Sequence, residues 1–207
     1  MNELLEGVKK FSNEEFSTYS NLFKKLTDKQ HPHTLFITCS DSRIQPGLIT
    51  QSRPGDLFII RNVANVVPPY DSSINHEDTL SALEYGVQVL EVNNIVVCGH
   101  SNCGGCKALF AEKNTFESMP HTGKWLELAR PAKDKAETRG DSSWKEDPHR
   151  SVEQENILLQ MDHLLSHPFI REKQENGSLR VHGWYYDIGA GEIFNYNLDK
   201  QLFEKVS

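Results

Sequence analysis

The stretch Thr34-Leu35-Phe36-Ile37-Thr38-Cys39-Ser40-Asp41-Ser42-Arg43 joins a short apolar run to a cluster of chemically reactive side chains. A second stretch has the same layout, because Asn94-Ile95-Val96-Val97-Cys98-Gly99 leads into His100-Ser101-Asn102-Cys103-Gly104-Gly105. Continuous apolar runs of this length are typical of parallel strands that are covered on both faces. In open parallel sheets, ligands bind beyond the carboxyl ends of the strands. We therefore expect the two clusters to meet at one end of a sheet.

Three apolar runs, at residues 34–38, 57–61 and 94–98, predict buried parallel strands. Between the second and the third run, residues 75–91 place apolar side chains at helical spacing. These side chains are Leu80, Leu83, Val87 and Leu90. The order strand, helix, strand predicts a right-handed crossover unit.

The last third of the chain predicts a capped helix and a hairpin. The helix begins near Ser151, and its apolar positions are Val152, Ile157, Leu158, Met161, Leu164 and Leu165. Residues 179–188 and 192–197 flank Gly189-Ala190-Gly191, which is typical of a hairpin. The predicted fold class is therefore α/β, with a central, mostly parallel β-sheet flanked by helices, an N-terminal helical arm and a C-terminal hairpin or edge strand.

Residues 1–30 are expected to form the helical arm. Ser12-Asn13-Glu14-Glu15 has the pattern of a capping box, with Phe11 and Phe16 placed as a hydrophobic staple, so the helix is predicted to begin at residue 12. Its apolar stripe could pack on the chain's own core or on a partner subunit. No internal repeat and no linker rich in Gly, Ser or Pro divides the sequence, so residues 1–207 are expected to form a single domain.

The composition excludes several classes of protein. The 207 residues are 37% hydrophobic and 25% charged, which is typical of a globular chain. The net charge is −7 and Lys and Arg are interleaved with acids, so nucleic acid is not an expected partner. No apolar stretch nears the roughly 18 residues of a membrane span, and the N-terminus lacks the layout of a signal peptide. We therefore expect no membrane association and a cytoplasmic location.

Two thiols and one imidazole form a candidate set of metal ligands. Cysteines in a cytosolic chain serve metal binding or catalysis more often than disulfides. Cys39 and His100 follow the ends of two predicted strands, and Cys103 lies three residues after His100. Zinc held by three protein ligands keeps its fourth position open for water or substrate, as in catalytic sites. We therefore expect a catalytic zinc site at Cys39, His100 and Cys103.

The remaining polar and reactive residues have more ordinary interpretations. Asp41 and Arg43 alternate with Cys39 on a segment expected to be extended, which would project all three side chains to one side. Cys98 is expected to lie in the core, and Cys106 to be a free thiol close to the site. Surface or capping roles are expected for the other histidines, which are His31, His33, His76, His121, His149, His163, His167 and His182.

The motifs Cys-Ser-Asp-Ser-Arg at residues 39–43 and His-Ser-x-Cys-Gly-Gly at residues 100–105 resemble those of the β-class carbonic anhydrases. The intervening residues 61–70, from Arg61-Asn62-Val63-Ala64-Asn65 to Tyr70, carry the same resemblance. It implies one Zn²⁺ per subunit on Cys39, His100 and Cys103, and a catalytic dyad of Asp41 and Arg43. The pocket of the plant-like subgroup would correspond to Gln30, Phe58, Val63 and Tyr85.

The resemblance also implies how the site works. Zinc-bound hydroxide would attack carbon dioxide and give bicarbonate and a proton, reversibly, in a carbonate dehydratase. Part of the substrate pocket would come from a second copy, so a homodimer or tetramer is expected. A second subgroup has a Trp, used in an inhibitory bicarbonate site, at the position of Phe36. We therefore expect an open, water-ligated form in which Asp41 pairs with Arg43.

Two other functions are compatible with the same residues. The first is hydrolysis of carbonyl sulfide or carbon disulfide on the same scaffold, which would share the metal site and differ only in the pocket. The second belongs to a different class, a zinc- or redox-responsive binding protein that uses the pair Cys103-x-x-Cys106.

Overall fold

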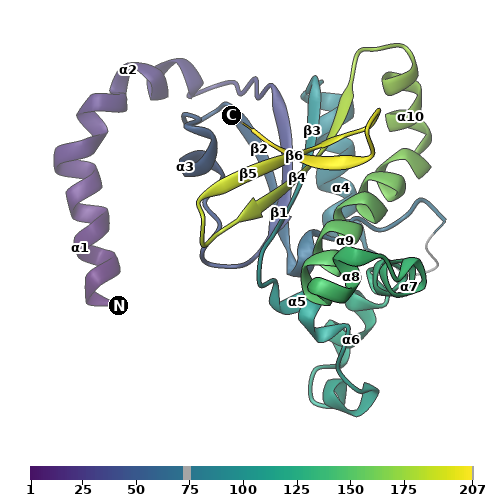
Figure 1. Cartoon of the computed structure of the whole chain (residues 1–207). Coiled ribbons are helices and arrows are strands. Elements are labelled where there is room, and N and C mark those ends of the chain that lie inside the picture. Colours follow the sequence, from purple (N-terminus) through teal and green to yellow (C-terminus); the bar gives the residue numbers. More distant parts are fainter. Residues whose placement is uncertain (72–75, 207) are drawn as a thin grey trace.

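The computed structural model describes residues 1–71 and 76–206, and its core is a six-stranded sheet in the order β2-β1-β3-β4-β5-β6 (Figure 1). β1, β2, β3 and β4 are parallel, whereas β5 and β6 are antiparallel to their neighbours. The strands are β1 (Thr34–Cys39), β2 (Leu57–Asn62), β3 (Asn94–His100), β4 (Arg180–Asp187), β5 (Glu192–Asn197) and β6 (Leu202–Lys205). This topology confirms the predicted α/β class, the mostly parallel sheet and the C-terminal hairpin.

Ten α-helices occur in the described residues, together with short 3₁₀ and π turns. They are α1 (Asn2–Lys10), α2 (Phe16–Leu26), α3 (Pro46–Thr50), α4 (Glu77–Glu84), α5 (Gly104–Ala108), α6 (Pro120–Leu126), α7 (Arg130–Arg139), α8 (Ser142–Glu146), α9 (Pro148–Ser166) and α10 (Pro168–Glu175). The helix predicted between β2 and β3 is α4, extended by a π-helical turn over Tyr85–Val89; its expected first residue, Asn75, lies outside the described residues.

α9 is the main helix over one face of the sheet. Two strand glycines allow its close approach, because a Cβ at Gly99 or Gly183 would lie 2.7 or 2.9 Å from Ile157 side-chain atoms. The helix begins at Pro148, and its N-terminus is capped by Asp147, whose side chain accepts a hydrogen bond from the Arg150 N–H. The predicted start near Ser151 was therefore one turn late. Pro at the first helical position and Asp before it explain the earlier start.

Helix in the N-terminal arm begins earlier than the predicted residue 12. Helical backbone runs from Asn2 to Leu26, with a π-helical turn over Phe11–Glu15. Lys10 and Phe11 have helical dihedral angles, so no helix begins at residue 12 and the predicted capping box is wrong. The arm stands away from the rest of the chain (Figure 1), and none of the residues of α1 or α2 is buried.

β2 is also less covered than predicted. It lies at the edge of the sheet, and only Ile60 among its six residues is buried, while Ile59 is 44% exposed. An apolar run indicates that the side chains of a strand are buried, but it does not show whether the same chain or a partner subunit buries them. In residues 1–71 and 76–206, no helix combines the length and apolar content that crossing a bilayer requires.

Candidate metal centre

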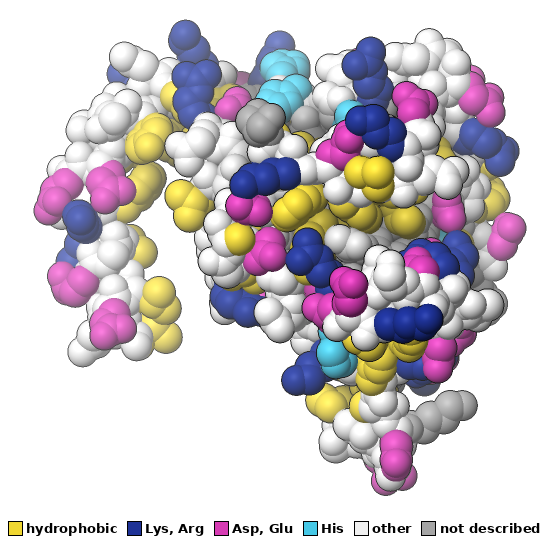
Figure 2. Space-filling view, viewed as in Figure 1, with side chains coloured by type: hydrophobic (Ala, Val, Ile, Leu, Met, Phe, Trp, Pro, Cys, Tyr) yellow, Lys and Arg dark blue, Asp and Glu magenta, His cyan; other side chains and the backbone are white. Residues whose placement is uncertain are grey.

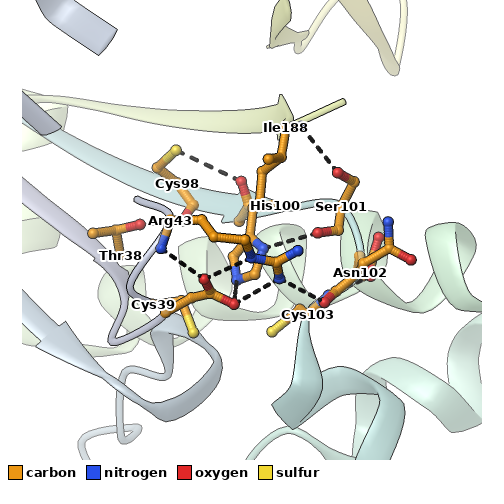
Figure 3. Close-up of polar contacts among 12 residues, drawn as sticks. Thr38, Cys39, Arg43, Cys98, His100, Ser101, Asn102, Cys103 and Ile188 are labelled. Carbon is orange, nitrogen blue, oxygen red and sulfur yellow. Dashed lines mark hydrogen bonds and ion pairs between the residues drawn. The ribbon is translucent and has the colours of Figure 1, made fainter. Parts of the chain in front are cut away.

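Three side chains that could hold a metal ion meet where β1 and β3 end (Figure 3). Cys39 is the last residue of β1, His100 is the last residue of β3, and Cys103 directly precedes α5. Parallel pairing, which matches Thr38 with Cys98, brings the two strand ends together. The two sulfur atoms and an imidazole nitrogen lie within 4.8 Å of one another, and all three residues are buried. The structure therefore assembles the donor set that the sequence suggested.

The orientation of His100 fits a metal ion. Its Nδ1 lies 3.0 Å from the Ser101 carbonyl oxygen, which can only accept, so Nδ1 carries the proton. Nε2 is then a lone-pair donor, and it is buried without a hydrogen-bond partner among the described residues. Metal-binding histidines commonly donate their other N–H to a carbonyl in this way.

The two thiols also fit a soft cation. Contact with Cys103, together with burial, raises the pKa of Cys39 to about 12. The neighbouring Cys106 thiol and burial raise the pKa of Cys103 to about 12. A metal ion must therefore displace two protons when it binds the sulfurs. Two sulfurs and one imidazole are a donor set suited to Zn²⁺ with one position left open.

Asp41 and Arg43 meet in a turn rather than on an extended segment. The Arg43 N–H donates to Asp41 Oδ1 at 2.9 Å, and the Ile44 N–H donates to the Asp41 carbonyl at 3.0 Å. The expectation that the segment from Cys39 to Arg43 is extended was wrong, because β1 ends at Cys39. Asp41 instead caps its own turn, as aspartates often do.

The Arg43 guanidinium forms a bidentate ion pair with the Asp41 carboxylate. Nε donates to Oδ1 at 2.9 Å and Nη2 donates to Oδ2 at 2.7 Å. Nη2 also donates to the Asn102 carbonyl, which ties this turn to the segment that carries Cys103. These hydrogen bonds hold the pKa of Asp41 well below its usual range. Asp41 Oδ2 lies 3.9 Å from His100 Nε2, so an ionised carboxylate faces the donor cluster.

Arg61, at the end of β2, fixes the same turn from the other side. Its Nε donates to the Cys39 carbonyl at 3.1 Å and its Nη2 donates to the Asp41 carbonyl at 2.6 Å. No separate role for this residue was predicted from the sequence. For a single arginine near the end of an apolar run, no sequence pattern predicts which carbonyl groups will accept its hydrogen bonds.

The four candidate pocket residues do not gather around this centre. Val63 directly follows Asn62, which pairs with Cys39, and it is partly exposed near the donors. Phe58 pairs instead with Leu35, four residues before Cys39, which places it roughly 13 Å farther along the sheet.

Tyr85 and Gln30 lie on the Phe58 side. The Tyr85 ring is 6.0 Å from the Phe58 ring, and Tyr85 and Gln30 line one surface hollow together with Leu26 and Leu90. Within one chain, the structure therefore separates Phe58 and its neighbours from the metal donors.

Two histidines have roles that the sequence did not indicate. His163 Nδ1 lies 2.7 Å from the Val67 carbonyl oxygen, and His167 Nε2 lies 2.9 Å from the Pro68 carbonyl oxygen. His167 is buried, so a surface role is wrong for this residue, although it occupies the cap position between α9 and α10. Both hold the loop after β2 against α9. Cys98 is in the core as predicted, and Cys106 is a buried free thiol beside Cys103.

Comparison with known proteins identifies the family of this chain. The family model described as carbonic anhydrase matches residues 34–193. A carbonic anhydrase of Helicobacter pylori (strain J99) is 37% identical over 208 residues, covering 99% of this chain and 94% of the relative.

Two solved structures extend the comparison. The β-carbonic anhydrase CcaA has a TM-score of 0.90 and 40% identity, covering 100% of this chain and 99% of the other. One of two tetrameric β-carbonic anhydrases from Sordaria macrospora has a TM-score of 0.73 and 33% identity, covering 94% and 92%. These relatives favour neither a sulfide-releasing hydrolase nor a redox-responsive binding protein. The chain therefore belongs to the β class of the carbonic anhydrase family, whose members are carbonate dehydratases.

Proposed function

We propose that this chain hydrates carbon dioxide reversibly at a Zn²⁺ ion held by Cys39, His100 and Cys103, with Asp41 and Arg43 as the catalytic dyad. The observation that carries the proposal is the buried Nε2 of His100, which has no hydrogen-bond partner in residues 1–71 and 76–206 and lies beside two sulfur atoms. When bound, zinc supplies Lewis acidity, which lowers the pKa of a water in its open position enough to make a nucleophile near neutral pH.

Asp41 would orient that nucleophile. An ionised carboxylate can accept a hydrogen bond from the attacking oxygen and fix the direction of its remaining lone pairs. Arg43 keeps Asp41 ionised, because its two hydrogen bonds favour the charged carboxylate and lower its pKa. The same pairing supports the expected open form, since a carboxylate held by Arg43 is less free to become a fourth metal ligand.

The substrate pocket would be completed by a second copy of the chain. Carbon dioxide is weakly polar and suits apolar walls such as Phe58, Val63 and Tyr85, with the Gln30 amide as a hydrogen-bond donor. Phe58 lies too far along β2 to serve the donors of its own chain. We therefore assign Phe58, Tyr85 and Gln30 to the site of the neighbouring subunit, and Val63 to its own.

The exposed apolar surface supports association with a second copy. Edge strand β2 presents Ile59, and Val63, Tyr85 and Val89 nearby are also substantially exposed. Hydrophobic side chains also lie along the side of the arm that faces the rest of the chain (Figure 2). The arm residues Leu4, Val8 and Phe11 are exposed. The Sordaria macrospora relative is described as tetrameric. A homodimer or a tetramer built from dimers would cover these surfaces.

The test combines metal analysis with carbon dioxide hydration on the purified protein. The natural chain should contain about one zinc ion per subunit and be active. Cys39→Ser and His100→Ala should lose both zinc and activity, whereas Cys106→Ser should keep both. An active protein without metal, or an inactive protein with full zinc, would refute the proposal.

A further inference from the structure

Glu153 is a buried carboxylate directly behind one metal donor. It lies on α9 and is only 4% exposed. Its Oε1 accepts a hydrogen bond from the Cys103 N–H at 2.8 Å, and its Oε2 accepts one from the Tyr185 hydroxyl at 2.9 Å. Carboxylates are rarely buried this deeply without a compensating partner. Both hydrogen-bond donors here are neutral, so the position of Glu153 requires an explanation other than a salt bridge.

The surroundings of Glu153 show that burying it is costly. Burial raises the pKa of Glu153 to about 7. The nearest arginine in sequence, Arg150, has its guanidinium 5.1 Å from the centre of the Tyr185 ring and 5.6 Å from that of Phe194. Arg150 therefore packs on the ring of Tyr185, the residue whose hydroxyl donates to Glu153. An apolar side chain of similar size at this position would stabilise the fold about as well as a carboxylate does.

We infer that Glu153 is a positioning residue for zinc: its hydrogen bond to the Cys103 N–H fixes the main chain so that the Cys103 sulfur faces Cys39 and His100 before the metal binds. This inference rests on the proposed zinc site. Cys103 lies between the end of β3 and the first residue of α5, where neither the strand nor the helix fixes its N–H. Glu153 supplies that missing acceptor.

The other donors are held from outside in a comparable way. Arg61 donates to the Cys39 carbonyl, and the Ser101 carbonyl orients the His100 ring. Each metal donor therefore has a partner that fixes its direction, which is how residues around a metal raise its affinity. Among these partners, Glu153 is the residue on α9, and it contacts the metal ligand Cys103 across the core.

Three substitutions separate positioning from general stability. Glu153→Gln keeps the shape, because the amide oxygen can accept from Cys103 while the amide nitrogen donates to the Tyr185 oxygen. Glu153→Ala removes both hydrogen bonds. Glu155→Ala is the matched control, since Glu155 is also a buried carboxylate on α9 but pairs with Arg139 at 2.8 Å.

The measurement is zinc affinity of the metal-free proteins, by competition with a chelating dye, with thermal unfolding recorded for each. Glu153→Ala should weaken zinc binding about 10- to 100-fold, and Glu153→Gln should stay within about threefold of the natural chain. Glu155→Ala should lower the unfolding temperature but leave zinc affinity unchanged. The absorption bands of bound Co²⁺, which report the arrangement of the donors, should shift in Glu153→Ala and stay unchanged in Glu155→Ala.

Two results would overturn the inference. One is an affinity for Glu153→Ala equal to that of Glu155→Ala, and the other is an equal loss in Glu153→Gln and Glu153→Ala. If Glu153→Ala does not fold, Glu153→Met replaces it, because it keeps the length of the side chain and removes the acceptor for the Cys103 N–H. An unchanged zinc affinity in Glu153→Met would then overturn the inference. Absence of zinc binding by the natural chain would instead refute the proposed function.

Discussion

Gly105 lies so close to Ala64 that a Cβ at position 105 would be 2.7 Å from the Ala64 Cβ. Gly105 belongs to the first turn of α5, directly after the segment that carries Cys103, and Ala64 lies in the loop after β2. Ala64 has a φ of 63°, in the left-handed region, so the backbone of this loop has little freedom to move away. This contact therefore fixes the distance between the Cys103 segment and the Val63 side of the centre.

We predict that Gly105→Ala lowers the free energy of unfolding by about 1–3 kcal/mol and reduces zinc content, because α5 must shift relative to Ala64. Gly104→Ala is the control, since a Cβ there meets no atom of the described part of the chain within 4 Å. Its unfolding free energy should stay within about 0.5 kcal/mol of the natural value. Denaturant unfolding and metal analysis of both variants test this. Equal stability of the two variants would contradict it.

The strands and the donor set could be predicted from the sequence because both depend on local pattern. An apolar run such as residues 34–38 is short, continuous and followed by polar residues, which few structures other than a buried parallel strand explain. Once two such strands are parallel, the residues at their ends must lie at one end of the sheet. The meeting of Cys39 with His100 follows from that geometry alone.

Other features depend on contacts that no local pattern encodes. Arg61 and Glu153 belong to no sequence motif, and their hydrogen bonds to Cys39 and Cys103 reach across from β2 and α9. The turn at Asp41 replaces an extended segment because the side chain bonds its own backbone. The start of the helix in the N-terminal arm was misplaced because a capping-box pattern also occurs inside helices. In each case, contacts in the folded structure select one of several conformations that the local sequence allows.

The Asp41–Arg43 pair predicts separate effects on chemistry and on metal binding. Asp41→Asn removes the charge that would accept a hydrogen bond from the nucleophile, so kcat/KM for hydration should fall by about 10²–10⁴ while zinc content stays constant. Stopped-flow hydration with metal analysis measures both. Loss of zinc together with activity would mean that Asp41 acts on the metal site instead of on the nucleophile.

Arg43→Lys tests why Asp41 stays ionised. Lysine cannot donate to both carboxylate oxygens in the planar geometry of arginine. The pKa of Asp41, held low by Arg43 in the natural chain, should therefore rise toward its usual range. Since the ionised carboxylate is the active form, activity on the acid side should be lost at a higher pH than in the natural chain. Arg139→Lys, a change in an ion pair away from the centre, should leave the pH profile unchanged.

Zinc uptake should release about two protons per site at pH 7. Burial and the neighbouring thiols raise the pKa of Cys39 and Cys103 to about 12, so both sulfurs of the metal-free protein are protonated. Because the thiolate form binds the metal, affinity should rise with pH, by up to about 100-fold per unit. Calorimetry in buffers of different ionisation enthalpy counts the protons. Cys106→Ser should release the same number, and a value near zero would show that the thiols are already ionised.

The assignment of Phe58 and Tyr85 to a neighbouring site predicts complementation between two defective chains. One chain carries Asp41→Asn, and the other carries Phe58→Ala with Tyr85→Ala. In a mixed dimer, the second chain contributes an intact metal half and the first contributes intact pocket residues, so one of the two sites is whole.

Mixed dimers can be isolated by co-expression with two different affinity tags. Their hydration activity should reach about half that of the natural dimer, whereas each variant alone should be far less active. The control pairs Asp41→Asn with Cys39→Ser, since both changes lie in the metal half and no whole site can form. If Phe58 and Tyr85 served the metal of their own chain, every site in the first mixture would still carry a defect. Activity no higher than the mean of the two parent variants would therefore place the whole pocket within one subunit.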